Sequence, residues 1–486
     1  MHYKIPKSRN ELVLFPQVDL WIDSNNSVRL IDTIIDSIIS KNPERFIWKG
    51  LKKSGCTSYS PSTMCKLLLY CYFNWISGSR RMEKETYRNL ELLWLLGDLH
   101  PDHWTICSFR RENKAQIRLI AIEFRKFLKS SGYIEGKTIA VDGSKMKAYT
   151  SPDMFTEKSI INRMKNIEKQ LEKYLNNIEE IDNLEDQLEE DQRVKKDLQG
   201  KITKLEKNKK KLEGINQQLK ATGKKYLSPN DPDASLMKGR DGKKAYYNLQ
   251  SGLCNKHKMI ALADLYTDEN DIDLLEEDYR NLKEQLDIIP ENLEADTGYG
   301  NTNQIMKIEE ESKTNCYIPI QEPVIKKIEK ENNISFEYDH EKDELECTEG
   351  KRLKLLQRNY KQGNQVYNIF HCSDYQDCPI KKKCTKSKYA RKVKRNIHQN
   401  WIDKYKCGLK TTYAKERIKE RKSIVEHPFG TIKMMMGKHC FILTSKNKAQ
   451  IEIDLYSTVY NIKRLLNIEK LSTILNQVKG YNWKIA

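Results

Sequence analysis

Residues 421–441 have the sequence RKSIVEHPFGTIKMMMGKHCF, in which one carboxylate, Glu426, stands among basic residues. A helix is expected here, and Lys433 follows Glu426 by seven residues. That spacing is about two helical turns, so both side chains share one helix face. An acid held among cations is suited to binding a metal ion if further carboxylates join it. The segment therefore directs attention to acids upstream.

Two upstream acids follow short apolar runs of β type. Asp142 ends KTIAVD, residues 137–142, and Asp296 follows NLEA, residues 292–295. An acid at a strand end is, by itself, more often a turn former or a helix cap. Phosphoryl chemistry with two divalent ions needs three or four oxygen ligands close together. We therefore predict that Asp142, Asp296 and Glu426 form one metal site.

The patterns around these acids predict an α/β core. Residues 245–267 are predicted to form two strands joined at 255–258, because apolar and aromatic residues flank a polar turn. Residues 271–289 have the spacing of an amphipathic helix, and residues 315–320 that of a short strand.

The N-terminal part of the chain has helical periodicity up to about residue 130. Asp102 is predicted to cap a helix that ends in Arg110 and Arg111. A compact helical domain with a basic helix is able to dock on DNA. A helical bundle with a solvated basic edge explains the same residues equally well.

Residues 156–225 differ in kind, because apolar residues recur at heptad spacing with Glu and Lys beside them. This pattern predicts a coiled coil or a helical hairpin without chemistry of its own, with its turn at Gly200 or at residues 191–193. The apolar positions are 164, 167, 171, 174, 178 and 181, followed by Leu198, Leu205, Leu212 and Leu219.

The chain of 486 residues carries a formal charge of +18, which favours a polyanionic partner, nucleic acid before anionic membrane. The excess is concentrated, since residues 381–422 hold 17 Lys and Arg but only Asp403, Glu416 and Glu420 as acids. No run of about 18 apolar residues exists, so no membrane span is expected. The N-terminus has no signal-peptide pattern, so a cytoplasmic location is expected.

Twelve cysteines in a cytoplasmic chain are expected to be reduced, so clusters among them suggest metal ligands. Four follow the spacing C-x24-C-x5-C-x5-C, which suits a structural Zn²⁺, with unliganded thiols as the alternative. His340 and His371 are alternative ligands. The four are Cys347, Cys372, Cys378 and Cys384. The others are predicted to be buried small hydrophobes: Cys56, Cys65, Cys71, Cys107, Cys254, Cys316, Cys407 and Cys440.

Three motifs occur in an order that carries a family resemblance. VDGSKMKA at 141–148, ADTGYGN at 295–301 and VEHPFGTIK at 425–433 resemble the catalytic blocks of bacterial insertion-sequence DDE transposases. Residues 231–250 and the helical N-terminus are similar to those enzymes as well, so the resemblance covers most of the chain. It implies an α/β fold with an RNase H-like mixed sheet flanked by helices.

The resemblance implies roles for the three acids. Asp142 would bridge two Mg²⁺ (or Mn²⁺) ions, and Asp296 and Glu426 would each hold one. Some relatives carry a tyrosine upstream of the glutamate, at a position where this chain has Ile418. DNA contacts are expected from Arg421, Lys433, Lys145, Lys147, Arg110 and Arg111.

The patterns and the resemblance together imply a domain division. It comprises a helical DNA-binding domain (1–130), an RNase H-like core in three parts (131–155, 226–325 and 399–470), a coiled-coil or helical-hairpin insertion (156–225), a Cys-rich zinc-binding insertion (326–398) and a tail (471–486).

The expected function follows from the resemblance. The chain would bind the terminal inverted repeats of its element, hydrolyse the element ends and join the 3′-OH ends to target DNA. A homodimer is expected, because two double-stranded ends must be held in one synaptic complex, and the location would be cytoplasmic and nucleoid-associated. Alternatives are a catalytically silent domesticated DNA-binding protein, a metal-dependent nuclease without strand transfer, and a coiled-coil scaffold.

Overall fold

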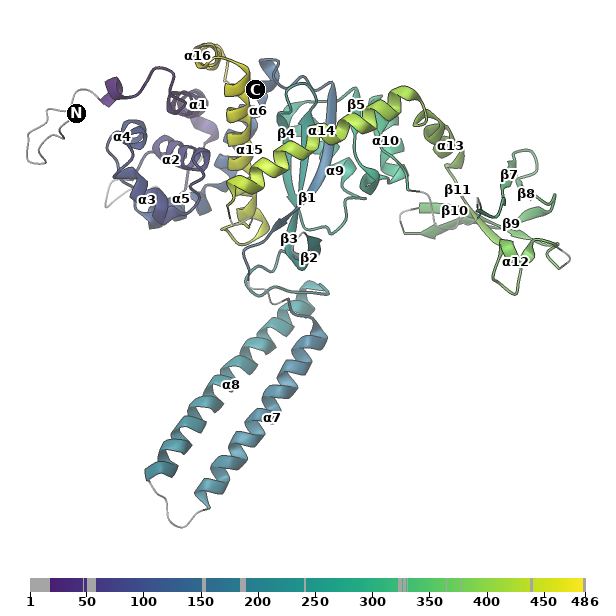
Figure 1. Cartoon of the computed structure of the whole chain (residues 1–486), viewed down its shortest axis with the longest axis horizontal. Helices are drawn as coiled ribbons and strands as arrows, with labels where there is room; N and C mark the ends of the chain where they lie inside the picture. The colour runs from purple at the N-terminus through teal and green to yellow at the C-terminus, as the bar shows by residue number, and fades with distance from the viewer. Residues whose placement is uncertain are drawn as a thin grey trace, which may run out of the picture. The chain divides into compact units, whose positions relative to one another are not determined.

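The structure, a computed structural model, divides into two compact units. Unit 1 comprises residues 1–135, 143–269 and 426–486, and unit 2 comprises residues 136–142 and 270–425. Strand β1 (Thr138–Lys147) and helix α14 (Thr412–Met435), both labelled in Figure 1, belong partly to each unit. The structure describes residues 18–483 apart from 47, 50–57, 151–153, 184–188, 240–241, 322–325, 327–328, 330, 364, 377 and 438–439.

The N-terminal part of unit 1 is helical, as its periodicity predicts. In α6, Ile117, Ile120, Phe124 and Phe127 recur at three- and four-residue spacing and are buried. Asp102 caps α5 as expected, since its Oδ1 accepts a hydrogen bond from Thr105 N at 2.6 Å. The elements are η1 Val18–Trp21, α1 Val28–Lys41, η2 Pro43–Arg45, α2 Pro61–Phe73, α3 Ser79–Thr86, α4 Leu90–Leu96, α5 His103–Glu112 and α6 Lys114–Ser130.

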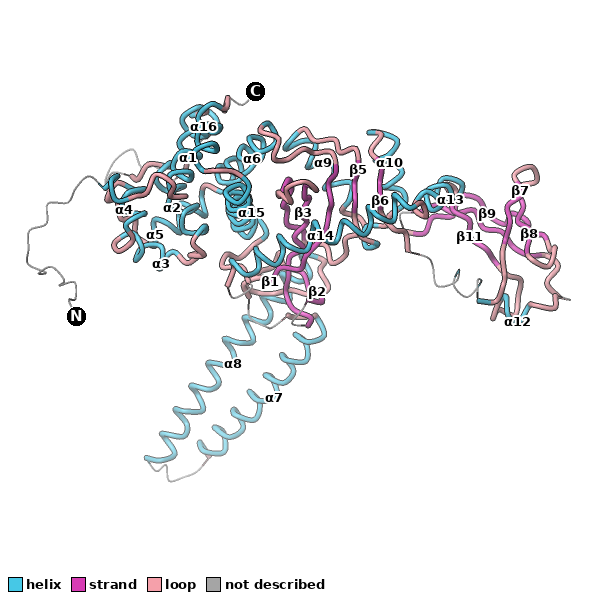
Figure 2. The backbone as a smooth tube through the Cα atoms, turned by 45° about the horizontal axis from the view of Figure 1, so that its top comes forward, coloured by secondary structure: helices cyan, strands magenta, loops and turns pink. Residues whose placement is uncertain are grey.

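Helices α7 (Glu157–Asp182) and α8 (Glu189–Thr222) lie side by side in both views (Figures 1 and 2). Lys209 of α8 reaches Glu168 of α7 at 2.8 Å, so the two helices pair within one chain. Their apolar base is formed by Phe155, Ile160, Leu212, Ile215, Leu219 and Leu227. The predicted turn at Gly200 or residues 191–193 is wrong, because α8 begins at Glu189 and continues without a break.

A six-stranded mixed sheet confirms the predicted α/β class. Its strand order is β2-β3-β1-β5-β6, and β4 also pairs with β3. The predicted pair of strands is present as β3 and β4, which run antiparallel on either side of residues 255–259. The bounds are β2 Ser235–Gly239, β3 Gly242–Cys254, β4 Ile260–Tyr266, β5 Asn292–Glu294 and β6 Asn315–Tyr317.

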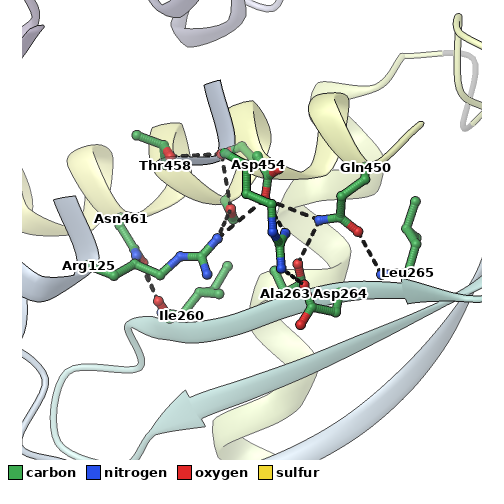
Figure 3. Close-up of polar contacts among 11 residues, drawn as sticks. Arg125, Ile260, Ala263, Asp264, Leu265, Gln450, Asp454, Thr458 and Asn461 are labelled. Atoms are coloured by element: carbon green, nitrogen blue, oxygen red, sulfur yellow. Dashed lines mark hydrogen bonds and ion pairs between the residues drawn. The ribbon is translucent and has the colours of Figure 1, made fainter. Parts of the chain in front are cut away.

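Helix α15 (Lys446–Ile468) covers the free edge of β4 in unit 1. Asn461 both accepts from Ile260 N and donates to Ile260 O, each at 2.9 Å (Figure 3). Gln450 does the same further along, accepting from Leu265 N at 2.8 Å and donating to Ala263 O at 2.9 Å. These side chains satisfy backbone groups that an edge strand would otherwise expose. Helix α16 (Leu471–Gly480) follows α15.

Buried charges join α6 to α15 and β4 in the same region. Asp454 on α15 is 1 % exposed, and Arg118 reaches it at 3.0 Å while also pairing with Asp264 of β4. Arg125 lies 3.6 Å from Asp454. Two arginines therefore balance two carboxylates, which is the condition under which buried charge is tolerated.

Unit 2 contains a second sheet of five strands in the order β11-β10-β9-β8-β7. Its apolar side is built on Leu345, Leu353 and Phe370. The strands are β7 Phe336–Asp339, β8 Glu344–Cys347, β9 Arg352–Gln362, β10 Gln365–Cys372 and β11 Lys392–Asn396. The remaining elements are α9 Leu275–Leu286, η3 Thr297–Tyr299, α10 Thr302–Ser312, α12 Lys381–Cys384 and α13 Gln399–Gly408. None of the helices in the described part of the chain could cross a membrane.

Candidate active site

Asp142 and Asp296 lie at matching register positions in unit 2, Asp142 within β1 and Asp296 two residues past the end of the neighbouring parallel strand β5. Strand β1 pairs with β5, and the last paired residues are Ala140 and Glu294. Each aspartate lies two residues beyond its paired residue, so the register brings both to the same edge of the sheet. Both side chains are partly exposed. The sequence prediction that apolar strands lead to both acids is therefore confirmed.

The prediction that β1 ends at Asp142 is wrong. The strand continues to Lys147, because its second half keeps hydrogen-bonded partners in unit 1. Lys147 O accepts from Phe441 N at 3.0 Å, and Ala148 N donates to Ala245 O at 3.0 Å. Asp142 is thus held within a strand and has little backbone freedom.

A buried tyrosine lies among the acids of unit 2. Tyr299 is fully buried, and burial raises the pKa of its hydroxyl well above the usual value. Four carboxylates raise that pKa further: Asp271, Asp278, Asp142 and Asp296. The motif analysis did not select Asp271 or Asp278, although they belong to the acidic stretch around the start of α9. The surroundings of Tyr299 therefore include two carboxylates, Asp271 and Asp278, in addition to the predicted pair Asp142 and Asp296.

The turn after Asp296 has a structural role. Asp296 Oδ1 accepts from Gly298 N at 2.7 Å and so caps η3. Asn301 caps α10 by accepting from Asn303 N at 3.1 Å, and it donates to Asp273 at 2.8 Å. A Cβ on Gly300 would lie 3.1 Å from Pro319 O, which favours glycine there. These bonds orient the loop that carries Asp296.

Helix α14 contacts three parallel strands in succession. Tyr413 packs edge-on against Tyr317 of β6, with ring centroids 5.8 Å apart. Arg417, one turn later, pairs with Glu294 of β5 at 2.5 Å. Arg421, a further turn on, lies 3.5 Å from Asp142 of β1. The four-residue spacing thus aligns one helix face with β6, β5 and β1.

The Arg417–Glu294 pair is buried beneath this edge of the sheet. Glu294 is 0 % exposed, and burial raises its pKa to about 7 although Arg417 opposes the shift. Sequence reasoning missed both residues. A signal was present, because Glu294 precedes Asp296 by two residues and Arg417 precedes Arg421 by four.

Glu426 and Lys433 occupy the second half of α14, in unit 1. Glu426 is exposed, and Lys433 Nζ donates to Ser144 Oγ at 2.7 Å. Ser144 follows Asp142 by two residues on β1, which places it on the same strand face. Pro428 lies within α14 and cannot donate to the carbonyl of residue 424, so the helix lacks one backbone hydrogen bond there.

The other predicted DNA contacts divide into exposed and buried residues. Lys145 and Lys147 are partly exposed on β1, and Arg111 is exposed on α5. Arg110 is 2 % exposed and donates to Tyr72 Oη and to Ser77 O, each at 3.0 Å. It follows the buried Ile106 by four residues and therefore faces inward. The structure contradicts a direct DNA contact from Arg110.

An aromatic pocket of about 820 Å³, part of it open to solvent, adjoins the end of β6. Trp401 stacks on Tyr405 with ring centroids 5.1 Å apart, and Tyr317 and Tyr413 also line the pocket. Tyr405 Oη accepts from Ile318 N at 3.1 Å, which fixes α13 against the edge strand. Lys404 adds a cation, so stacking and ionic contacts are both available here.

The four clustered cysteines line one cavity in the five-stranded region. Cys347, Cys372, Cys378 and Cys384 surround about 440 Å³ of space that includes open solvent. Burial raises the pKa of the Cys372 and Cys384 thiols, and neighbouring cysteines raise it further. The prediction that Cys65, Cys71, Cys254 and Cys316 are buried is confirmed, Cys107 and Cys440 are partly buried, and Cys407 is exposed. Cys56 lies outside the described residues.

Neither the acidic nor the cysteine cluster has the arrangement of a complete metal site. Within the described ranges, no three or more His, Cys, Asp or Glu side chains are placed so that they could hold a metal ion. The donor types nevertheless suit metals, since paired carboxylates favour Mg²⁺ or Mn²⁺ and four thiols favour Zn²⁺.

Comparison with known families gives two matches. Residues 346–466 match the family described as transposase DDE domain, a segment that contains Arg421, Glu426 and Lys433. Residues 16–112 match the transposase domain family DUF772, which covers the N-terminal helices. Asp142 and Asp296 lie outside both segments. No curated protein and no solved structure matches the chain.

Both matched families are transposase domains, which belong to DNA-modifying enzymes, and a DDE domain implies dependence on a divalent metal. Because transposases act on DNA, these matches support DNA as a partner of this protein. One match near the N-terminus and one toward the C-terminus, both to transposase domains, support the resemblance of this chain to the insertion-sequence DDE transposases.

Proposed function

We propose that this transposase binds the terminal inverted repeats of its element, cleaves the element ends and transfers their 3′-OH groups into target DNA. One observation carries the proposal: the register of β1 and β5 sets Asp142 and Asp296 side by side at one sheet edge. The order of Asp142, Asp296 and Glu426 along the chain resembles the order of the catalytic acids in DDE transposases.

We propose that these three carboxylates hold two Mg²⁺ or Mn²⁺ ions. All three side chains would supply carboxylate oxygens to hold these ions. When bound, such ions activate the attacking oxygen and stabilise the leaving oxygen. The proposal is supported by the partial exposure of both aspartates and by the position of Glu426 between Arg421 and Lys433 on one helix.

The cations around the acids would orient the DNA. Arg421 is 8 % exposed and lies 3.5 Å from Asp142, so it would hold that carboxylate in place and add positive charge beside the bound phosphate. Lys433 is oriented by Ser144 on the strand that carries Asp142. Lys145, Lys147 and Arg111 are proposed as backbone contacts. The aromatic pocket beside β6 offers a stacking surface for a nucleotide.

The finer architecture is part of this proposal. We propose an RNase H-like core at residues 131–155, 226–325 and 399–470, interrupted by insertions at 156–225 and 326–398. A helical DNA-binding domain would precede the core, and a short tail would follow it. A homodimer would hold two element ends in one nucleoid-associated complex, because strand transfer requires both ends together.

The test uses the full chain and duplexes that carry the ends of its element. With Mg²⁺ or Mn²⁺ the protein is expected to nick the ends and join them to a target duplex. Asp142→Asn, Asp296→Asn and Glu426→Gln should each reduce nicking by more than about 1000-fold, since each removes a charged ligand worth several kcal/mol. Asp197→Asn, in an exposed pair with Lys201 on α8, is the matched control.

Each outcome separates this proposal from its rivals. Nicking without joining would identify a nuclease, and DNA binding without nicking would identify a silent DNA-binding protein. Nicking that survives all three substitutions would place the active site elsewhere.

We also propose that the four-cysteine cavity holds one structural Zn²⁺ when the protein is metallated. The four thiol groups converge on one space beneath the five-stranded sheet. Metal binding would deprotonate the thiols and favour closer approach of their sulfur atoms. The apolar cluster beside the four thiols is small, so a bound metal ion would add stability that this cluster alone supplies only weakly.

Elemental analysis of the purified protein tests this site. One zinc per chain is expected, and Cys378→Ser with Cys384→Ser should remove it. Cys407→Ser, which alters an exposed cysteine elsewhere in unit 2, should retain zinc. A wild-type protein that contains no zinc after expression with zinc supplied would refute the site.

A further inference from the structure

Strands β9, β10 and β11 are neighbours in the five-stranded sheet (Figure 1), and their two faces differ in character. On one face Leu355, Phe370 and Val393 occupy one row across the strands and pack into the apolar cluster. Because side chains alternate along a strand, the neighbouring row must point away from that cluster. That row belongs to the opposite side, here called the outer face.

The outer face carries a row of basic residues. His371 of β10 is paired with Lys354 of β9 on one side and with Lys392 of β11 on the other. Lys354 and Lys392 are exposed, and His371 is partly exposed. Two residues along β11, Lys394 lies with its ammonium 4.9 Å from the centroid of the Tyr360 ring. Three lysines, a histidine and a tyrosine therefore share this face.

Negative charge is absent from these strands. The segments 352–362, 365–372 and 392–396 contain seven Lys and Arg and neither Asp nor Glu. The arginines of β9 are paired toward β8, Arg352 with Glu344 at 3.7 Å and Arg358 with Asp343. Across the described residues, no carboxylate pairs with Lys354 or Lys392. The arginines are thus used within the sheet, whereas the outer lysines are available to a partner.

We propose that the outer face of β9–β11 binds the phosphate backbone of duplex DNA, away from the site of cleavage. Lys354 and Lys392 are two strands apart, about 10 Å, which is comparable to the width of about 12 Å of a major groove. Cations at that spacing on one sheet face can contact phosphates on both sides of a groove. The face presents few base-reading groups, so it binds DNA largely without regard to sequence.

This inference rests on the proposed function only in taking DNA as the substrate. Binding to a duplex of arbitrary sequence, without divalent metal, needs neither terminal repeats nor cleavage. The experiment measures the affinity of the full chain for such a duplex at several salt concentrations. It compares wild type with K354A/K392A/K394A and with a control of equal charge change, K204A/K207A/K211A, whose lysines are exposed on α8.

The outer-face variant is expected to weaken binding roughly ten-fold or more and to reduce the salt slope by about 3, one for each phosphate that the lysines no longer neutralise. The α8 variant should bind like wild type. K354R/K392R/K394R should restore binding, because it keeps the charge and so separates charge removal from damage to the sheet. An unchanged melting temperature for the alanine variant would confirm that its sheet is intact.

Three results would overturn the inference. The first is that the outer-face variant binds DNA like wild type. The second is that both alanine variants lose affinity equally. The third is that phosphatidylserine vesicles compete with the duplex through the same lysines. Loss of binding with intact nicking of short element ends supports the inference. If the outer-face variant loses DNA binding but the wild-type protein never nicks element ends, the proposed function is refuted and the binding inference stands.

Discussion

Two clusters of arginines and carboxylates in this molecule look alike in composition but differ in balance. In unit 1, Arg118 and Arg125 approach Asp454, and Arg118 also pairs with Asp264. All of these contacts join elements of one core (Figure 3). The cluster has as many arginines as carboxylates, so its charge is internally compensated.

The cluster in unit 2 has an excess of acid at a sheet edge. Arg417 and Arg421 pair with Glu294 and Asp142, whereas Asp296 pairs with no lysine or arginine among the described residues. The difference indicates two roles. The compensated ion pairs of unit 1 hold helices and strands together, whereas the partly exposed carboxylate of unit 2 that has no arginine partner in the described part of the chain is able to bind a cation. The two clusters should therefore respond in opposite ways to the same substitution.

The largest expected effect comes from removing one carboxylate charge in each cluster. Asp454→Asn should lower the free energy of unfolding by about 3–5 kcal/mol, because the buried Arg125 loses its counter-ion and Arg118 loses one of its two carboxylate partners. Asp296→Asn should change that free energy by less than about 1 kcal/mol and abolish metal-dependent nicking. Urea unfolding and a nicking assay on both variants measure the contrast.

The comparison would be broken if Asp296→Asn destabilised the protein as much as Asp454→Asn. It would also be broken if Asp454→Asn, assayed at a temperature where it stays folded, abolished nicking completely.

A second prediction concerns pH and the neighbouring buried acid Glu452. Burial raises its pKa to about 7, against 4.5 in an unfolded chain. The folded state thus binds the proton more tightly, so stability falls as pH rises from about 4.5 to 7. Between pH 5 and pH 7.5, Glu452→Gln should remove about 2 kcal/mol of this pH dependence. Urea unfolding at pH 5 and pH 7.5 measures it.

The glutamine keeps an oxygen that can accept from Ile442 N and Leu443 N, as Glu452 Oε1 does. Asp454 titrates in both proteins, so its contribution cancels in the difference. Identical pH dependence in wild type and variant would show that Glu452 does not titrate on unfolding.

A third, smaller effect is expected at the buried pair of unit 2. Arg417→Met should cost about 2 kcal/mol, less than a buried pair usually does, because Glu294 has a pKa of about 7 and can take up a proton. The destabilisation should be smaller at pH 6 than at pH 8. Arg80→Met, on the surface of α3, provides a control for arginine removal.

The smallest effect is expected at the edge of β4. Gln450→Ala should cost about 1 kcal/mol, because water can reach the backbone groups it leaves. Asn461→Ala should cost more, since Asn461 is fully buried and both groups of Ile260 would remain unpaired. Thermal unfolding of the two variants ranks them, and the reverse order would contradict the assigned edge contacts.

Local patterns predicted the parts of the fold that depend on local physics. The Asp102 cap, the β3–β4 pair and helix α9 each followed from capping or periodicity in a short window. The approach of Asp142 and Asp296 was also predictable, because apolar strands that end in acids suggest a shared sheet edge.

Tertiary contacts decided the rest. The length of β1 depends on distant partners such as Phe441, and the inward face of α5 decides that Arg110 packs against Tyr72. The Arg417–Glu294 pair joins residues more than a hundred positions apart, so no single window of sequence contains it. Periodicity could have assigned Arg110 to the core, since it follows Ile106 by four residues.

The contacts of α14 with three strands restrict how this part of the chain can vary in length. Tyr413, Arg417 and Arg421 reach β6, β5 and β1 at steps of four residues, and Glu426 follows on the same helix. One inserted residue would turn everything after it by about 100° and shift it by about 1.5 Å. The interval from Tyr413 to Glu426 therefore cannot gain or lose a residue, whereas the α7–α8 hairpin can change length without disturbing the acids.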